Sequence, residues 1–104
     1  MLIVVRDVAF VSIADMALVR FTANLIRHCA ADDVRASGAT VREVLAAVFR
    51  DRPQVQSYVL DDQGELRKHM SAFVDGVQIR DRRRLSDAVR PDSIIDLIQA
   101  LSGG

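Results

Sequence analysis

The residues most clearly able to take part in a reaction are at the end of the chain, where an apolar segment leads into Leu101-Ser102-Gly103-Gly104. A carboxylate is a poor electrophile at neutral pH, but conversion to an acyl-adenylate with ATP gives it a good leaving group. A sulfur donor can then attack the acyl carbon and leave a thiocarboxylate. Glycine has no Cβ and adopts conformations closed to other residues, so a Gly-Gly end suits an enclosed nucleotide site. The pattern indicates Gly104 as the reacting group, carried by Leu101, Ser102 and Gly103.

Other reactive side chains form no comparable constellation. His28 and His69 have no serine, cysteine or metal-ligand pattern around them, so we interpret both as surface residues. Cys29 is the only cysteine, which excludes an internal disulfide and a four-cysteine iron–sulfur cluster. It is either a reactive thiol or, as we prefer, a small buried apolar residue on a strand. We therefore expect a carrier or co-substrate and not an independent enzyme, alone or as the small subunit of a sulfurtransferase complex.

The composition limits the remaining classes of function. A chain of 104 residues fits one domain, and equal numbers of basic and acidic residues, 14 of each, argue against nucleic-acid binding. Arg6 and Asp7 interrupt the apolar N-terminus, which is therefore not a signal peptide. No segment approaches the roughly 20 apolar residues of a membrane helix, so we expect a cytoplasmic protein without a membrane partner. Lys68 is the only lysine, and so the only internal amine for chain-forming isopeptide chemistry.

One amphipathic helix is the clearest element that could support the tail. Thr40 and Glu43 fit a capping box, in which each side chain accepts a free backbone N–H at the helix start. Apolar residues follow at helical spacing and form one stripe: Val41, Val44, Leu45, Val48 and Phe49. Pro53 ends the helix, with Asp51 or Arg52 as its last residue. The segment 54–60 is ambiguous between a helical turn and a strand.

The other segments predict strands and turns. Alternating apolar residues predict strands over 16–23 and, more weakly, 28–36, separated by a turn at 24–27. Asp75-Gly76 between apolar runs predicts a hairpin over 70–80, and a last strand covers 93–101.

The connecting segments are less regular. The acidic run 61–65 lacks the ligand spacing of a calcium loop, so we interpret it as a solvated turn. The connection 81–84 carries three adjacent arginines and is an anion or partner patch or, as we prefer, a solvated loop. Leu85 and Val89 suit a short helical turn.

This order of elements predicts an α+β fold, with one mixed sheet and the helix on one face. We expect the domain to span 16–104, preceded by an extension, 1–15, that is an added strand, a free arm, or sequence upstream of a true start at Met16.

These pieces resemble the family of the molybdopterin-synthase small subunit and the thiamin sulfur carrier. The resemblance rests on the strand with Val19 and Phe21 and, in order, on the segments Gly38–Leu45, Asp62–Leu66, Phe73–Gly76 and the Gly-Gly end. The stretch Leu66-Arg67-Lys68-His69 is similar to longer members, which deliver sulfur to small metabolites or tRNA. Gln99-Ala100 stands where the molybdopterin branch often has two prolines, and Met1–Asp15 has no counterpart.

The resemblance implies a ubiquitin-like β-grasp fold of four to five strands and a specific mechanism. A ubiquitin-activating-type adenylyltransferase would adenylate Gly104, with ATP used by that enzyme and no cofactor bound by the carrier. Sulfur would be installed as a thiocarboxylate, and a sulfur-accepting synthase would dock the carrier and take up the tail. Docking in the family uses an apolar sheet surface, for which Ile98 and Leu101 are candidates; Ile98 fits core packing equally well.

Two other functions remain open at this point. A ubiquitin-like modifier would join Gly104 to lysines of target proteins, and a non-covalent interaction module would not need the Gly-Gly end. The sequence also does not choose between molybdopterin, thiamin, cysteine, thiolated tRNA and a thio-containing secondary metabolite as the destination of the sulfur.

Overall fold

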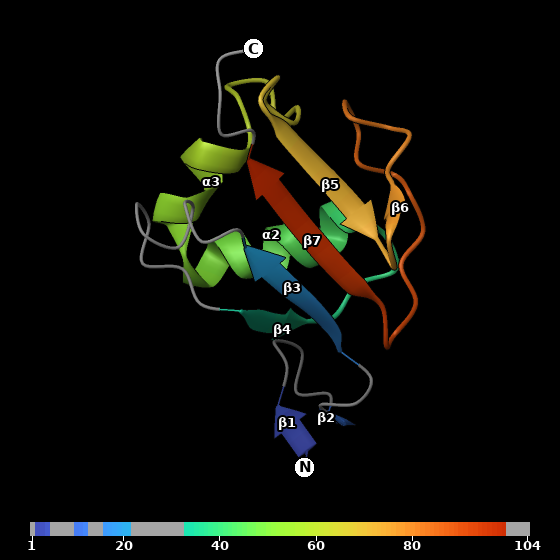
Figure 1. Cartoon of the computed structure of the whole chain (residues 1–104). Coiled ribbons are helices and arrows are strands. Elements are labelled where there is room, and N and C mark those ends of the chain that lie inside the picture. The colour runs from blue at the N-terminus through green and yellow to red at the C-terminus, as the bar shows by residue number, and fades with distance from the viewer. Residues whose placement is uncertain (1, 5–9, 13–15, 22–32, 100–104) are drawn as a thin grey trace.

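A five-stranded mixed sheet organises the computed structural model, which describes residues 2–4, 10–12, 16–21 and 33–99 (Figure 1). The strand order is β4-β3-β7-β5-β6. The bounds of these strands are Ala17–Phe21 for β3, Val34–Ala36 for β4, Met70–Val74 for β5, Val77–Gln78 for β6 and Ile94–Gln99 for β7. The predicted turn at 24–27, His28, Cys29 and the tail from residue 100 lie outside the described residues.

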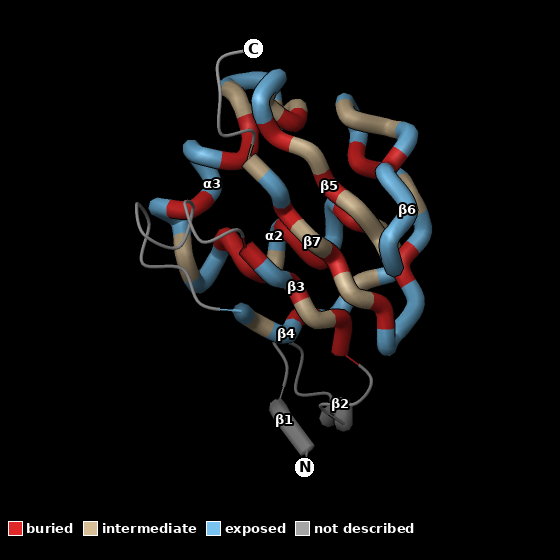
Figure 2. The backbone as a smooth tube through the Cα atoms, in the orientation of Figure 1, coloured by how far each residue is buried: buried red, intermediate tan, exposed pale blue. Residues whose placement is uncertain are grey.

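β7 is the central strand. It runs parallel to β3, with Val19 opposite Ile95, and antiparallel to β5, with Ala72 opposite Leu97. Burial alternates along β7 because successive side chains point to opposite faces: Ile95 and Leu97 are 0% exposed, whereas Ile98 is 40% exposed (Figure 2). The predicted final strand is confirmed.

The helices cover one face of the sheet (Figure 1). α2 spans Val41–Asp51, and its predicted apolar stripe is buried. Thr40 Oγ1 accepts a hydrogen bond from Glu43 N at 3.2 Å. Glu43 Oε1 accepts from Ala39 N at 3.0 Å, one residue earlier than in the expected capping box. The helix start is thus fixed by the predicted pair of side chains.

The ambiguous segment after α2 is a second helix. α3 spans Pro53–Val59 and begins with proline in its first turn, where a missing N–H costs no helical hydrogen bond. Val55 and Val59 are 0% exposed and join the core. Pro53 therefore separates two helices, as its effect on the preceding residue predicts.

The core lies between this helical layer and the sheet (Figure 2). Gly38 permits close packing before α2, because a Cβ there would lie 2.7 Å from Val44 N. The core members with less than 2% exposure and the largest side chains are Leu45, Met70, Leu85, Ile95, Leu97, Val19, Val41, Val44, Val48, Val55 and Val59. The predicted α+β architecture, with a helix packed on one face of a mixed sheet, is confirmed.

The β5–β6 hairpin turns at Asp75-Gly76, as predicted. Both residues have positive φ, 51° and 84°. This is the pattern of a type I′ turn, whose twist matches that of the flanking strands. Aspartate and glycine tolerate this left-handed backbone better than other residues do.

The helical turn expected at Leu85 and Val89 is wrong. Leu85 has a φ of 55°, and Val89 N donates to Ala39 O at 2.9 Å. Thr40 and Ala88 form an isolated antiparallel bridge, and Val41 N and Arg42 N donate to Asp87 O and Leu85 O. The segment 85–89 runs beside the start of α2 and accepts hydrogen bonds from its free N–H groups, while both apolar side chains still enter the core.

The extension 1–15 contains two described strands, β1 (Leu2–Val4) and β2 (Phe10–Ser12). They pair antiparallel, with Ile3 opposite Val11, in a sheet separate from the five-stranded one. Strand structure is thus present in the described part of the extension, and where the domain begins stays a prediction.

Substitution of two neighbouring residues on β7 tests this assignment of faces. We expect Leu97→Ala to lower the free energy of unfolding by about 2–5 kcal/mol, because it leaves a cavity in the core. Ile98→Ala, the matched control on the opposite face, should cost less than about 1 kcal/mol. Urea unfolding measures both values. Equal losses for the two variants would contradict the assignment.

Candidate functional site

The candidate site is the C-terminal end of β7, from which the predicted reactive tail continues. Gln99, the last described residue, pairs with Met70 at the start of β5. Leu101, Ser102, Gly103 and Gly104 lie outside the described residues, so their proposed roles stay predictions. The structure therefore shows what holds the base of the tail.

A buried hydroxyl anchors the start of β7. Ser93 is 1% exposed; its Oγ donates to Asp75 Oδ2 at 2.8 Å and accepts from Arg90 N at 2.9 Å. Asp75 Oδ1 accepts from Ile94 N at 2.9 Å. The hydrogen bonds from Ile94 N–H and the Ser93 hydroxyl, with the nearby Arg90 charge, hold the pKa of the Asp75 carboxyl below its ordinary value. The hairpin turn and the central strand are thereby joined.

An ion pair links β7 to β3 on the face opposite the helices. Arg20 Nε and Nη2 donate to the two carboxylate oxygens of Asp96, at 2.6 and 2.9 Å. This bidentate hydrogen bond, together with the negative charge of Asp96, raises the pKa of Arg20. Opposite charges at alternating positions of two apolar strands were the sequence signal for this pair, which our sequence analysis did not use.

Ile98 lies on this same open face. It pairs with Ser71 of β5, and Phe73 of β5 lies opposite Asp96. On the same face, nearer the start of β7, Leu18 of β3 lies opposite Ile94. Core packing is therefore excluded for Ile98, whose side chain is 40% exposed. Whether it docks a partner remains a prediction.

A half-buried arginine, Arg82, holds the start of β5, which pairs with the end of β7. Arg82 Nη2 donates to Arg67 O and to Met70 O, both at 2.7 Å. Leu66 N donates to Arg82 O at 2.9 Å, and Arg67 Nε donates to Ser57 O at 2.7 Å. Arg82 thus ties the 81–84 connection to the residue that pairs with Gln99. Neither spacing nor composition signalled this contact.

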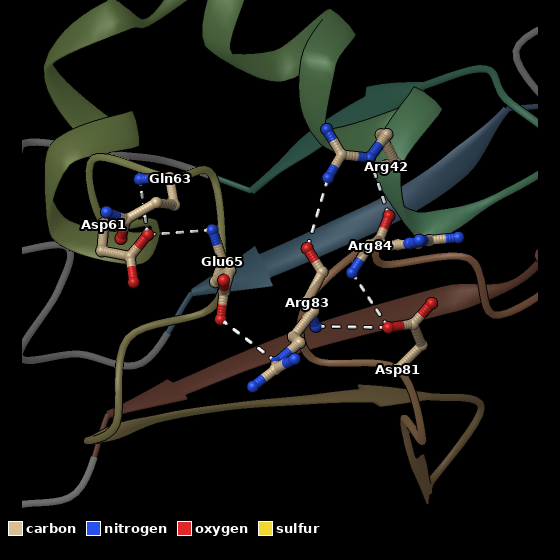
Figure 3. Close-up of polar contacts among 7 residues, drawn as sticks. All are labelled: Arg42, Asp61, Gln63, Glu65, Asp81, Arg83 and Arg84. Carbon is tan, nitrogen blue, oxygen red and sulfur yellow. Dashed lines mark hydrogen bonds and ion pairs between the residues drawn. The ribbon is translucent and has the colours of Figure 1, made fainter.

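Two aspartates organise the loops beside this end of the sheet (Figure 3). Asp61 Oδ1 accepts from Gln63 N and Glu65 N, at 2.9 and 3.0 Å. The acidic run 61–65 is therefore a turn closed by its own carboxylate. Within the described residues, no group of three or more histidine, cysteine, aspartate or glutamate side chains could hold a metal ion.

Asp81 plays the same part in the second loop (Figure 3). Its Oδ1 accepts from Arg83 N and Arg84 N, at 3.2 and 2.9 Å, and its Oδ2 accepts from the Ser86 hydroxyl. The Ser86 hydroxyl and the Arg84 N–H hold the pKa of the Asp81 carboxyl below its ordinary value. Of the two histidines, His69 is exposed in the turn before β5, and His28 lies outside the described residues.

A family model described as the ThiS family matches residues 19–104. This chain belongs to the ThiS family. The match spans the sheet, both helices and the Gly-Gly segment, and it confirms the resemblance to the ubiquitin-like sulfur carriers.

Several solved structures have the same fold. SAMP1 from Haloferax volcanii is 26% identical, with a TM-score of 0.73 over 86% of this chain and 99% of that one. A chain of the Amycolatopsis orientalis BexX/CysO complex is 21% identical, with a TM-score of 0.72 over 85% and 99%. CysO of Mycobacterium tuberculosis is 19% identical, with a TM-score of 0.70 over 82% and 99%. The last two show the shared fold.

A comparison with curated protein sequences gave no match. None of the described helices has the length and hydropathy needed to cross a bilayer.

The Asp75 carboxylate gives a pH prediction. Its folded-state pKa is lowered, so it stabilises the fold above the ordinary pKa of about 3.9, and this stabilisation is lost as the pH falls through the folded-state value. We expect Asp75→Asn, which keeps a side chain that tolerates positive φ, to lower the melting temperature at neutral pH. The deficit should shrink below about pH 4.

Thermal unfolding from neutral pH to about pH 2 measures this deficit. Asp92→Asn, on the exposed turn after Pro91, is the control and should follow the unmodified protein at every pH. A deficit for Asp75→Asn that stayed constant across the whole range would contradict the role assigned to the charge.

Proposed function

We propose that this ThiS-family protein carries sulfur as a thiocarboxylate on Gly104. A ubiquitin-activating-type adenylyltransferase is the expected partner. In its site, a Gly104 carboxylate oxygen attacks the α-phosphorus of ATP, and pyrophosphate leaves. Hydrosulfide then attacks the acyl carbon, the bond to AMP breaks, and the sulfur remains on the chain as the thiocarboxylate. A sulfur-accepting synthase takes it onward.

One observation carries the proposal. In a ThiS-family chain, the strand that leads into Leu101-Ser102-Gly103-Gly104 is also the centre of the sheet. β7 is hydrogen-bonded on both sides up to Gln99, so the tail starts from a fixed position. A short glycine-ended segment can then reach into a partner while the domain stays outside it. The domain positions the acyl group, and ATP and the partner supply the chemistry.

The carrier proposal predicts a change in intact mass. We expect incubation with ATP, sulfide and the activating enzyme to raise the mass by the difference between a sulfur and an oxygen atom. Mass spectrometry of the whole chain measures this exchange. Deletion of Gly104 should abolish this mass change, because the shortened C-terminus no longer fits the site of the activating enzyme.

Cys29 makes a second control necessary. A persulfide on this thiol would add a whole sulfur atom, which differs from replacement of oxygen by sulfur. Cys29→Ala should therefore keep the expected mass change. A gain of a whole sulfur atom in place of the exchange, kept after Gly104 deletion and lost in Cys29→Ala, would place the sulfur on the thiol and overturn the proposal.

The similarity to SAMP1 of Haloferax volcanii, whose name stands for small archaeal modifier protein 1, favours a second candidate function. In that function a lysine amine attacks the Gly104 adenylate, or a thioester made from it, and forms an isopeptide bond. Both functions start from the same activated carboxylate and differ in the nucleophile.

Branched peptides test the modifier function. Cleavage before aspartate leaves Asp96–Gly104 on a modified lysine. If the chain modifies proteins, peptides from its native cells should carry this remnant, and a strain lacking Gly104 should have none. The absence of the remnant in cells that contain the thiocarboxylate form would leave sulfur transfer as the function.

A further inference from the structure

The backbone at Arg83 and Arg84, here called the arginine tip, is fixed from both sides (Figure 3). Its N–H groups donate to Asp81 Oδ1, at 3.2 and 2.9 Å. Its carbonyls accept from Arg42: Nε lies 2.7 Å from Arg84 O, and Nη2 lies 3.4 Å from Arg83 O. Every backbone polar group of the tip therefore bonds to a side chain. In a simple solvated loop, these backbone groups could bond to water instead.

The guanidinium groups of the tip are left in solvent. The Arg83 side chain is 84% exposed, and its Nε lies 3.7 Å from Glu65 Oε1, which is too long for a hydrogen bond. Arg84 is also exposed. An exposed ion pair of this kind contributes little to stability. The fold thus holds the backbone firmly, and among the described residues the charged ends of the two arginines make no strong contact.

The tip is linked to the end of β7 through its neighbour Arg82. Arg82, the preceding residue, donates to Met70 O, and Met70 pairs with Gln99 at the end of β7. The loops carrying these residues lie at the same end of the sheet in Figure 1. An enzyme that takes up the tail therefore approaches the arginine tip.

We propose that the arginine tip docks against carboxylates on the enzyme that activates Gly104. The inference rests on the proposed function, which supplies that enzyme. Guanidinium groups bind carboxylates with two parallel hydrogen bonds, and because the backbone of the tip is already fixed, docking orders only the two side chains. Charged contacts at the rim of an interface raise the rate of association. The tip thus helps to deliver the tail and takes no part in the chemistry.

The surroundings of the tip favour a protein over a nucleic acid. The chain has 14 basic and 14 acidic residues, and Glu65, Asp61 and Asp62 lie in the neighbouring loop. A phosphate backbone would bring continuous negative charge past these carboxylates. A protein surface can place carboxylates against the tip and other groups against its acidic neighbours.

Charge reversal at the tip tests the inference. The assay is ATP–pyrophosphate exchange by the ubiquitin-activating-type adenylyltransferase of the same organism, with the whole chain as substrate. We expect R83E/R84E to raise the KM for the carrier by about tenfold and leave kcat unchanged. The KM of the unmodified carrier should rise with ionic strength, and that of the variant should rise less.

Arg50→Glu is the control, because it reverses an exposed charge at the end of α2. Its KM should stay near that of the unmodified chain, and thermal unfolding should show that both variants are folded. An unchanged KM for R83E/R84E, or a loss in kcat alone, would overturn the docking role. Weaker binding of bulk tRNA, measured by fluorescence anisotropy, with an unchanged KM would reassign the tip to nucleic acid. No exchange with the unmodified chain would overturn the proposed function and the docking role together.

Discussion

The pairing of β7 with β3 and β5 is the constraint on which the rest of the molecule depends. β7 supplies Ile95 and Leu97 to the core and also carries the segment that ends in Gly104. Its position inside the sheet means that both edges of its backbone are hydrogen-bonded. The base of the tail therefore cannot move without disrupting the sheet. The stability of the sheet and the position from which the C-terminal segment starts depend on the same strand.

Polar contacts fix β7 along its length in a way that apolar packing alone does not. Ser93 and Asp75 hold its start, Arg20 and Asp96 link its middle to β3, and Arg82 braces the residue opposite its end. Apolar burial is non-directional, so it selects the buried face but leaves small shifts of the strand inexpensive. Hydrogen bonds have defined lengths and directions and so fix the position of the strand.

This arrangement separates the scaffold from the chemistry. Described side chains near the end of β7, including Arg82 and Arg67, are engaged with backbone carbonyls. Their role is to hold loops together beside the tail. The proposed carrier function needs a fixed surface from which the C-terminal segment continues, and the described residues at the end of β7 provide that surface.

Local patterns in the sequence determined the helix from Val41, the turn at Asp75-Gly76 and the existence of the final strand, because each depends on neighbouring residues. Only the tertiary structure decided which face of β7 is covered, and so that Leu97 is buried while Ile98 is exposed. It also decided that 85–89 forms no helical turn, since that segment bonds to the start of α2. The contacts of Arg82 with Met70 and of Arg42 with Arg84 join residues far apart in the chain, and no local pattern records such distances.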